Sequence, residues 1–254
     1  MKFQAIRCET DGRAAKIVLD RQPLNILDVP MMEEISAALD ALPAEVEFLT
    51  FSGAGERGFS AGADVRDHAP DRAAAMLKAF HGVIRRIVAG RWIAVAAVHG
   101  ICLGGGCELA TICDFVVAEE SATFGQPEIH LGCFPPVAVV TFPALAGPRA
   151  AADLILTGRT ISAGEARSLG LVTRVVGPGE APKAAAELVN ELSGMSGNAL
   201  RLARQGLGIF GGPVFNEALA ESESLYLNSL LKSEDAAEGV RAFLEKRAPV
   251  WQGR

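Results

Sequence analysis

Two glutamates lie in otherwise apolar stretches of the sequence and could transfer protons. Glu108 follows three glycines in CLGGGCELATICDF (102–115), and Glu128 lies 20 residues further on in TFGQPEIHLG (123–132). Burying an isolated acid is costly unless it is paired or functional, and burial raises a carboxyl pKa towards the range useful for proton transfer. Each glutamate alone could be a surface acid in a short loop. The two together, beside glycine-containing loops, favour acid–base chemistry whose type these local signals do not specify.

Two glycine-containing loops lie where predicted strands give way to other elements. They are GFSAGADVRDH (58–68) and the loop around Gly104, Gly105 and Gly106. Small residues let a ligand approach the backbone, whose N–H groups then act as donors. Two such N–H groups converging on one carbonyl oxygen would form an oxyanion hole. Either loop alone is equally consistent with a tight turn, and a phosphate loop is disfavoured because there is no Walker lysine and no GxGxxG motif.

The elements around these residues alternate between strands and helices, which predicts an α/β core. From about residue 182 onward only helical patterns occur, so a helical tail is expected to follow a β-rich core. Strands are predicted at 14–20, 46–53, 93–100 and 171–176, with two more within 114–125. Helices are predicted over 28–42, 108–113 and 233–247, with Asp28 and Ser233 as caps and a capping box formed by Ser162 and Glu165.

The bulk composition is that of a soluble, enzyme-sized chain. It has 254 residues, 50% of them hydrophobic, and a formal net charge of −6, which argues against a general nucleic-acid role. Its five cysteines are irregularly spaced, as is typical of reduced thiols in a cytosol. We find neither a signal-peptide h-region nor an apolar run that could span a bilayer, and we expect a cytoplasmic protein without membrane contact. The four histidines lack metal-ligand spacing, so no metal is expected.

Beyond these local signals, the chain resembles the enoyl-CoA hydratase/isomerase, or crotonase, family almost from end to end. The resemblance is carried by LDRQPLNIL (19–27), GFSAGADV (58–65), AAVHGICLGGGCELATICDF (96–115), FGQPEIHLG (124–132), LTGRTISAGEARSLGLVTRVV (156–176) and AFLEKRAP (242–249). It implies a spiral of ββα units over residues 1–195 that contains the acyl-CoA site. It also implies a C-terminal helical region, 196–254, used in trimer formation, with hexamers as dimers of trimers.

The same resemblance assigns roles to the residues of the site. The oxyanion-hole amides would belong to Ala63 and Gly105, and they would hold the thioester oxygen while an enolate forms. Glu108 and Glu128 match the two glutamates of the true hydratases. The presence of both favours addition of water over the isomerase, decarboxylase or hydrolase reactions of relatives. We expect Glu108 to activate water and Glu128 to protonate the α-carbon, although these two roles could be exchanged.

Contacts to coenzyme A are also implied by the resemblance. Ala61 and Asp64 fall where the family's loop meets adenine, and Arg66 falls where relatives often carry a lysine near the coenzyme phosphates. Lys246 matches a tail lysine that approaches the coenzyme of a neighbouring subunit. Coenzyme A would arrive as part of the substrate, so no separate cofactor is expected.

One segment departs from the family pattern. After EIHLG the hydratases usually continue with a glycine-rich stretch, whereas this chain has CFPPVAVVTFPAL (133–145). Prolines and β-branched residues should make this wall of the acyl pocket stiffer and more apolar, with Val137 and Val139 bulkier than glycine. Together with PLNILDV, the segment is similar to the branch that hydrates cyclohexa-1,5-diene-1-carbonyl-CoA. A catalytically idle binding protein on the same fold is the alternative of another class, and the net charge and both glutamates weigh against it.

Overall fold

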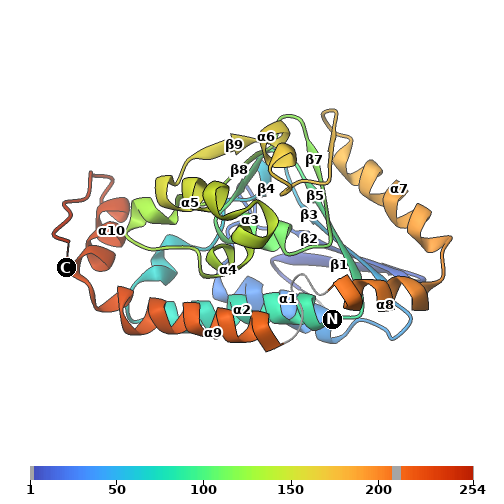
Figure 1. Cartoon of the computed structure of the whole chain (residues 1–254), viewed down its shortest axis with the longest axis horizontal. Helices are drawn as coiled ribbons and strands as arrows, with labels where there is room; N and C mark the ends of the chain where they lie inside the picture. The colour runs from blue at the N-terminus through green and yellow to red at the C-terminus, as the bar shows by residue number, and fades with distance from the viewer. Residues whose placement is uncertain (1–2, 208–212, 254) are drawn as a thin grey trace.

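The computed structural model describes residues 3–207 and 213–253. The chain winds as a spiral whose successive turns contribute strands to two sheets (Figure 1). The larger sheet contains, in spatial order, β1 (Ile6–Asp11), β2 (Ala14–Leu19), β3 (Phe48–Gly53), β5 (Ile93–Val98), β7 (Phe115–Glu119) and β10 (Arg174–Val176). The smaller sheet contains β4 (Gly58–Ser60), β6 (Ile101–Leu103), β8 (Thr123–Gly125) and β9 (Thr160–Ser162).

Consecutive turns of the spiral repeat one pattern: a strand in the larger sheet, a strand in the smaller sheet, then a helix. The repeating helices are α2 (Ala73–Ala89), α3 (Gly105–Thr111) and, after a short 3-10 helix η2 (Pro127–Leu131), α4 (Pro136–Leu145). The other helices are α1 (Val29–Asp40), η1 (Val65–His68), α5 (Pro148–Thr157), α6 (Ala163–Ser168), α7 (Ala181–Ser193), α8 (Gly197–Leu207), α9 (Pro213–Asn228), η3 (Leu230–Lys232) and α10 (Glu234–Leu244). The predicted α/β spiral of ββα units is confirmed.

The strand β5 lies inside the larger sheet and is buried on both faces. This burial explains why the sequence of β5 is a continuous apolar run. Its alternate residues Ala94, Ala96 and Val98 belong to the main core. Ile93 and Val95 point to the other face, where they pack with the apolar side of α7. Because successive side chains of a strand point to opposite faces, a strand covered on both sides must be apolar at every position.

A glycine makes the corner between the two sheets possible. Between β5 and β6, Gly100 adopts a φ of +51°, a conformation that L side chains rarely adopt. A Cβ at this position would lie 2.4 Å from the carbonyl oxygen of Arg57. The chain can therefore pass directly from a strand of the larger sheet into a strand of the smaller one, beside β4.

The strands β4, β6 and β8 of the smaller sheet pair in parallel, so they end at the same edge. Gly58 pairs with Ile101, and Cys102 pairs with Phe124. The segments that follow these three strands, 61–64, 104–108 and 126–128, therefore meet at that edge. This topology brings together the two glycine-containing loops and both glutamates singled out in the sequence.

Asn25 holds the first of these segments, 61–64, in place through hydrogen bonds. Its side chain is fully buried, and Nδ2 donates to the carbonyl oxygens of Ala54 and Gly58 at 2.9 and 3.0 Å. The Ser60 hydroxyl donates to the Asn25 carbonyl oxygen at 2.7 Å and accepts from the Gly62 N–H at 3.1 Å. A buried side chain with all of its partners in place rigidifies the loop that it binds.

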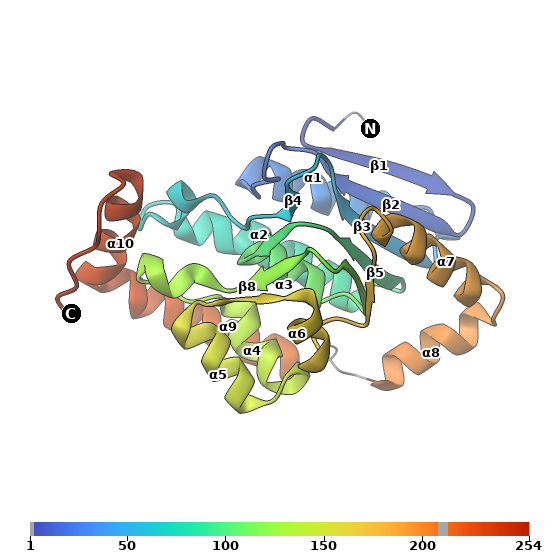
Figure 2. The same cartoon turned by 90° about the horizontal axis from the view of Figure 1, so that it is seen from above.

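The C-terminal helices differ in how they pack on the rest of the chain. α9 packs along α2 and α4, and Phe215, Leu219 and Tyr226 on it belong to the main core. α8 has no fully buried side chain. Figure 2 shows α8 on the flank next to α7, whereas α10 lies at the opposite side near the C-terminal end. Among the described residues, no helix is both long and apolar enough to cross a membrane.

Some local expectations need correction. α3 begins at Gly105 instead of Glu108. Glycines are tolerated in the first turn, because the N–H groups there have no partner within the helix. The Ser162 hydroxyl accepts from the Glu165 N–H as expected, but the Glu165 carboxylate pairs with Arg159 at 2.7 Å instead of completing a capping box. Asp28 and Ser233 are confirmed as caps, accepting from the N–H groups of Met31 and Ala236.

Candidate active site

Two backbone amides lie close together at the edge of the smaller sheet. The Leu27 N–H donates to the Gly62 carbonyl oxygen and the Asp64 N–H donates to the Leu27 carbonyl oxygen, at 2.9 and 3.0 Å. This parallel bridge leaves the intervening Ala63 N–H directed to the opposite side. Gly105 is the first residue of α3, so its N–H has no partner within the helix. A Cβ on Gly105 would lie 3.5 Å from the Ala63 nitrogen. The two amides are therefore neighbours, as an oxyanion hole requires.

Gly104 must be glycine for two independent reasons. Its φ of +52° and ψ of −131° lie in a region that other residues avoid. A Cβ there would come within 2.6 Å of Oε1 of Glu128. This glycine therefore turns the chain from β6 into α3 and leaves room for the second glutamate against the backbone.

Glu108 is buried and bound by the first turn of α4. Its Oε1 accepts the N–H groups of Val137 at 2.9 Å and Ala138 at 2.8 Å. Burial raises the pKa of Glu108 to about 7, while the two amide hydrogen bonds act in the opposite direction. The free N–H groups at the start of a helix also favour a negative charge. Glu108 is thus the glutamate whose ionised form is stabilised.

Glu128 is buried without such support. Among the residues that the structure describes, its Oε2 has no hydrogen-bond partner. Burial, and then the nearby Glu108 carboxylate, raise the pKa of Glu128 well above its ordinary value. Two carboxylates that share one site do not both ionise readily. The negative charge of the pair is therefore favoured on Glu108 and the proton on Glu128.

A small cavity of about 20 Å³ lies between these groups. Its lining includes both glutamates, both amide residues and apolar side chains of α2. The complete lining is Ala63, His68, Met76, Leu77, Phe80, Gly105, Glu108, Glu128, Phe134, Pro136 and Tyr226. A cavity of this size has room for about one water molecule. Phe134 and Pro136 belong to the segment 133–145, which departs from the family pattern. Val137 of the same segment is buried in the core instead of lining the cavity, because α4 turns its side chain away.

An open cleft of about 720 Å³ adjoins the small cavity, with Ala63, His68 and Glu128 lining both. Ala61, Asp64 and Arg66 line this cleft, together with residues of α10. Arg66 binds Asp64 at 2.5 Å, and this hydrogen bond lowers the pKa of Asp64. Lys246 does not line the cleft, so its contact with a coenzyme of a neighbouring subunit stays a prediction.

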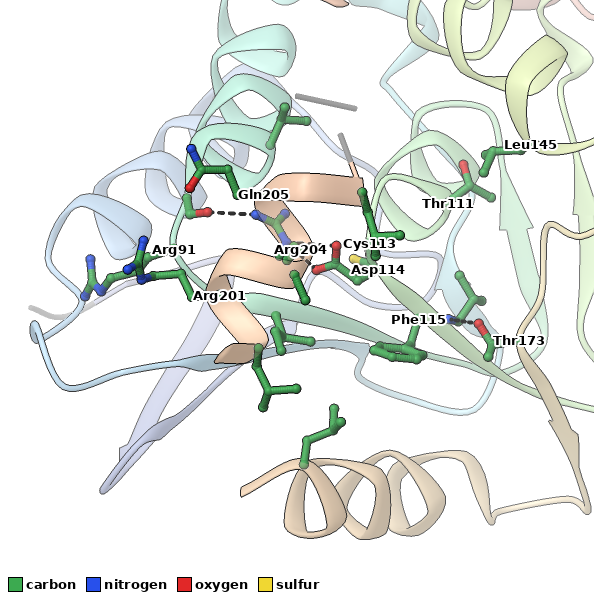
Figure 3. Close-up of a pocket in the computed structure, with 18 of the residues that line it drawn as sticks. Arg91, Thr111, Cys113, Asp114, Phe115, Leu145, Thr173, Arg201, Arg204 and Gln205 are labelled. Carbon is green, nitrogen blue, oxygen red and sulfur yellow. Dashed lines mark hydrogen bonds and ion pairs between the residues drawn. The ribbon is translucent and has the colours of Figure 1, made fainter. Parts of the chain in front are cut away.

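A larger cavity of about 840 Å³ lies elsewhere, between α8 and the ends of β5 and β7 (Figure 3). Two of its charged groups are paired: Arg204 binds Asp114 at 2.7 Å, and it also binds the Gly90 carbonyl oxygen at 2.8 Å. Asp114 in turn accepts the Ala94 N–H at 2.8 Å. These contacts hold α8 to the core, and the cavity is lined by none of the acids and amides gathered at the edge of the smaller sheet.

The chain matches the model of the family described as Enoyl-CoA hydratase/isomerase over residues 9–254. The chain belongs to the enoyl-CoA hydratase/isomerase family. It is an enzyme of the lyase class.

Three known proteins illustrate the relationship. The chain is 36% identical to cyclohexa-1,5-dienecarbonyl-CoA hydratase of Thauera aromatica, over 97% of this chain and 95% of the relative. It is 37% identical to a probable enoyl-CoA hydratase of Rhizobium meliloti, with 100% of each chain covered. A crystal structure of an enoyl-CoA hydratase from Mycobacterium avium subsp. paratuberculosis K-10 superimposes with a TM-score of 0.87 at 27% identity, covering 99% of this chain and 100% of the other.

Three cleft residues of this enoyl-CoA hydratase/isomerase family member were not identified from its sequence. Arg21 and Arg247 add positive charge to the cleft, and Arg247 is held by the buried carboxylate of Glu238. Arg21 lies in LDRQPLNIL, so its motif was visible although its role was not. His68 borders both cavities, and its Nδ1 lies 3.1 Å from the Asp64 carbonyl oxygen. Burial lowers the pKa of His68, which favours a neutral ring with Nε2 as an acceptor.

Replacing Glu128 by glutamine should stabilise the protein at alkaline pH and change little at acidic pH. The fold raises the pKa of Glu128, so the folded chain retains a proton that the unfolded chain releases above its ordinary pKa of 4.5. Wild-type stability is therefore highest below that value and falls as the pH rises towards the folded pKa. The stability advantage of Glu128→Gln should therefore grow as the pH rises above 4.5, measured by urea denaturation at a series of pH values.

Glu33→Gln is the matched control, because Glu33 is exposed on α1. Its stability difference from the wild type should stay constant over the same pH range. If the difference for Glu128→Gln were also constant, the description of Glu128 as a protonated buried acid would be wrong.

Proposed function

We propose that this enzyme adds water across a conjugated double bond of an unsaturated acyl-CoA thioester. The observation that carries the proposal is the pair of buried glutamates with unequal environments beside two adjacent backbone amides. A hydratase needs one group that accepts a proton from water, one that gives a proton to carbon, and donors for the charge that develops on the thioester oxygen. All of these groups line the same small cavity.

The geometry supports a reaction in which each group has one task. The Ala63 and Gly105 N–H groups donate to the thioester oxygen and stabilise its enolate. Ionised Glu108 takes a proton from water as the water oxygen bonds to the β-carbon. The electrons of the double bond move towards the thioester oxygen, and protonated Glu128 then delivers its proton to the α-carbon. This addition transfers no electrons to or from a redox partner, so the proposed reaction needs no separate cofactor.

We further propose that the acyl group is cyclohexa-1,5-diene-1-carbonyl. The support comes from the 36% identity to the Thauera aromatica enzyme of that name and from the wall that Phe134 and Pro136 form beside the glutamates. A flat ring has few conformations to lose on binding and presents an apolar face to such a wall. A flexible linear chain would lose more entropy when it is ordered there.

Glu108→Gln and Glu128→Gln should each lower kcat by about 10²–10⁴-fold, the range typical of a positioned acid or base. Glutamine keeps the shape of the side chain but neither accepts nor delivers the proton. Coenzyme A binding should remain nearly unchanged, as titration calorimetry with a saturated acyl-CoA can measure. Glu187→Gln, exposed on α7, should retain full turnover. Near-wild-type turnover of either active-site variant would refute the two-glutamate mechanism.

The enzyme should prefer the cyclic dienoyl thioester over crotonyl-CoA. We expect kcat/KM to be at least about tenfold higher for cyclohexa-1,5-diene-1-carbonyl-CoA, equivalent to about 1.4 kcal/mol of transition-state binding. Loss of the conjugated thioester, followed for both substrates under one set of conditions, measures this ratio. Equal values, or a preference for crotonyl-CoA, would leave general enoyl-CoA hydration standing and remove the cyclic assignment. Release of free coenzyme A would instead indicate a hydrolase.

We also propose that the protein assembles as trimers, or as hexamers built from two trimers, in the cytoplasm. α8 exposes Leu202 at 50% and Leu207 at 69%, and α9 exposes Leu225 at 56%. Subunit contacts would cover such apolar side chains. All five cysteines are free thiols, in keeping with a reducing compartment.

Sedimentation velocity at micromolar concentration should give the mass of three or six chains. Replacing Leu202 and Leu207 together by serine should shift the distribution towards smaller species, because it removes apolar surface without touching the core. A wild-type monomer at that concentration would contradict the assembly proposal.

A further inference from the structure

Tyr226 is the one tyrosine of the chain, and it reaches the catalytic cavity from a helix far away in the sequence. It lies on α9, is 1% exposed and lines the same small cavity as Glu108 and Glu128. Within the part of the chain that the structure describes, its hydroxyl makes no hydrogen bond of good geometry, and the Cys133 thiol beside it is only a weak partner. A buried hydroxyl without a strong partner is costly, so such a group in a catalytic cavity needs an explanation.

Several contacts hold Tyr226 in this position. One turn earlier on α9, the Ser222 hydroxyl donates to the Pro136 carbonyl oxygen at 3.0 Å and joins α9 to α4. Glu223 binds His81 at 2.5 Å and Arg85 at 2.7 Å on α2. The Tyr226 ring meets Phe134 edge to face, with centroids 5.3 Å apart. The phenol is therefore directed into the cavity by a packed and hydrogen-bonded helix.

The cavity has the size of one water molecule, and a buried water needs two to four polar partners. The amides of Val137 and Ala138, which lie nearby, are already used by Oε1 of Glu108. The polar side-chain groups of the lining that remain for a water are the two carboxyl groups, His68 and the Tyr226 hydroxyl. Burial, then Cys133 and the two carboxylates, raise the pKa of Tyr226, which keeps its phenol protonated.

We propose that Tyr226 is a third catalytic side chain, whose hydroxyl donates a hydrogen bond to the oxygen that is added to the substrate. This role rests on the proposed hydration. The water oxygen has two lone pairs: one forms the bond to carbon, and the other accepts from the phenol. One water proton goes to Glu108, and Tyr226 keeps its own proton throughout. In the reverse reaction the same phenol donates to the departing hydroxyl oxygen.

Tyr226→Phe tests the proposal, because it removes the hydroxyl and retains the ring. We expect kcat for hydration to fall by about 10–100-fold while KM changes by less than about threefold. Phe215→Leu is the matched control, since it loosens the core packing of the same helix without altering the cavity lining, and it should retain turnover within about threefold. Equal losses in both variants would assign Tyr226 a structural role only. Unchanged turnover in Tyr226→Phe would overturn the proposal.

A second readout is independent of turnover. Tyrosine labelled with ¹³C at the ring carbon that bears the hydroxyl gives a single protein signal, because the chain has one tyrosine. 3-Hydroxybutyryl-CoA should shift this signal, and butyryl-CoA, which lacks the hydroxyl, should shift it much less. Equal shifts with both ligands, or none with either, would refute the contact. A wild-type enzyme that hydrates neither test thioester would refute the proposed function, whereas a working hydratase indifferent to Tyr226→Phe would refute only this role.

Discussion

The parallel pairing of three very short strands, β4, β6 and β8, is the constraint on which the site depends. Each strand has only three residues, yet parallel register makes all three end at one edge. The segments that follow carry Ala63, Gly105 and the two glutamates, which lie up to 65 residues apart in the chain. The corner at Gly100 and the buried Asn25 secure this arrangement, because they let the smaller sheet lie close to the larger one and fix the loop after β4.

Electrostatic interactions then make two chemically identical carboxyl groups differ in how readily they ionise. Both are buried, and two like charges in one small cavity repel each other. The first turn of α4 breaks the symmetry, because its amides bind Glu108 and leave Glu128 without a comparable donor. These amides belong to the segment 133–145. Pro136 begins α4 at a position where a missing N–H costs nothing, and the amides that follow it bind Glu108.

The C-terminal helices extend this organisation beyond the spiral. α9 belongs to the expected helical region, but it packs on the core of its own chain and lines the catalytic cavity through Tyr226. α10 lines the open cleft, where Arg247 is held by Glu238. The division into residues 1–195 and 196–254 stays a prediction, and the helices of the second part already serve the site of the first.

The sequence by itself determined the strands with continuous or β-branched apolar runs, the caps at Asp28 and Ser233, and the two glutamates as candidates. These are local properties, set by side-chain periodicity and by hydrogen bonds over a few residues. The resemblance to a family supplied the spiral and the roles of Ala63 and Gly105. Only the tertiary structure decided that Glu108 is bound by the amides of Val137 and Ala138, that Glu128 is not, and that Tyr226 enters the cavity. Those facts depend on groups that lie 29 residues apart (Glu108 and Val137) or 118 residues apart (Glu108 and Tyr226), and packing that local patterns do not encode sets their geometry.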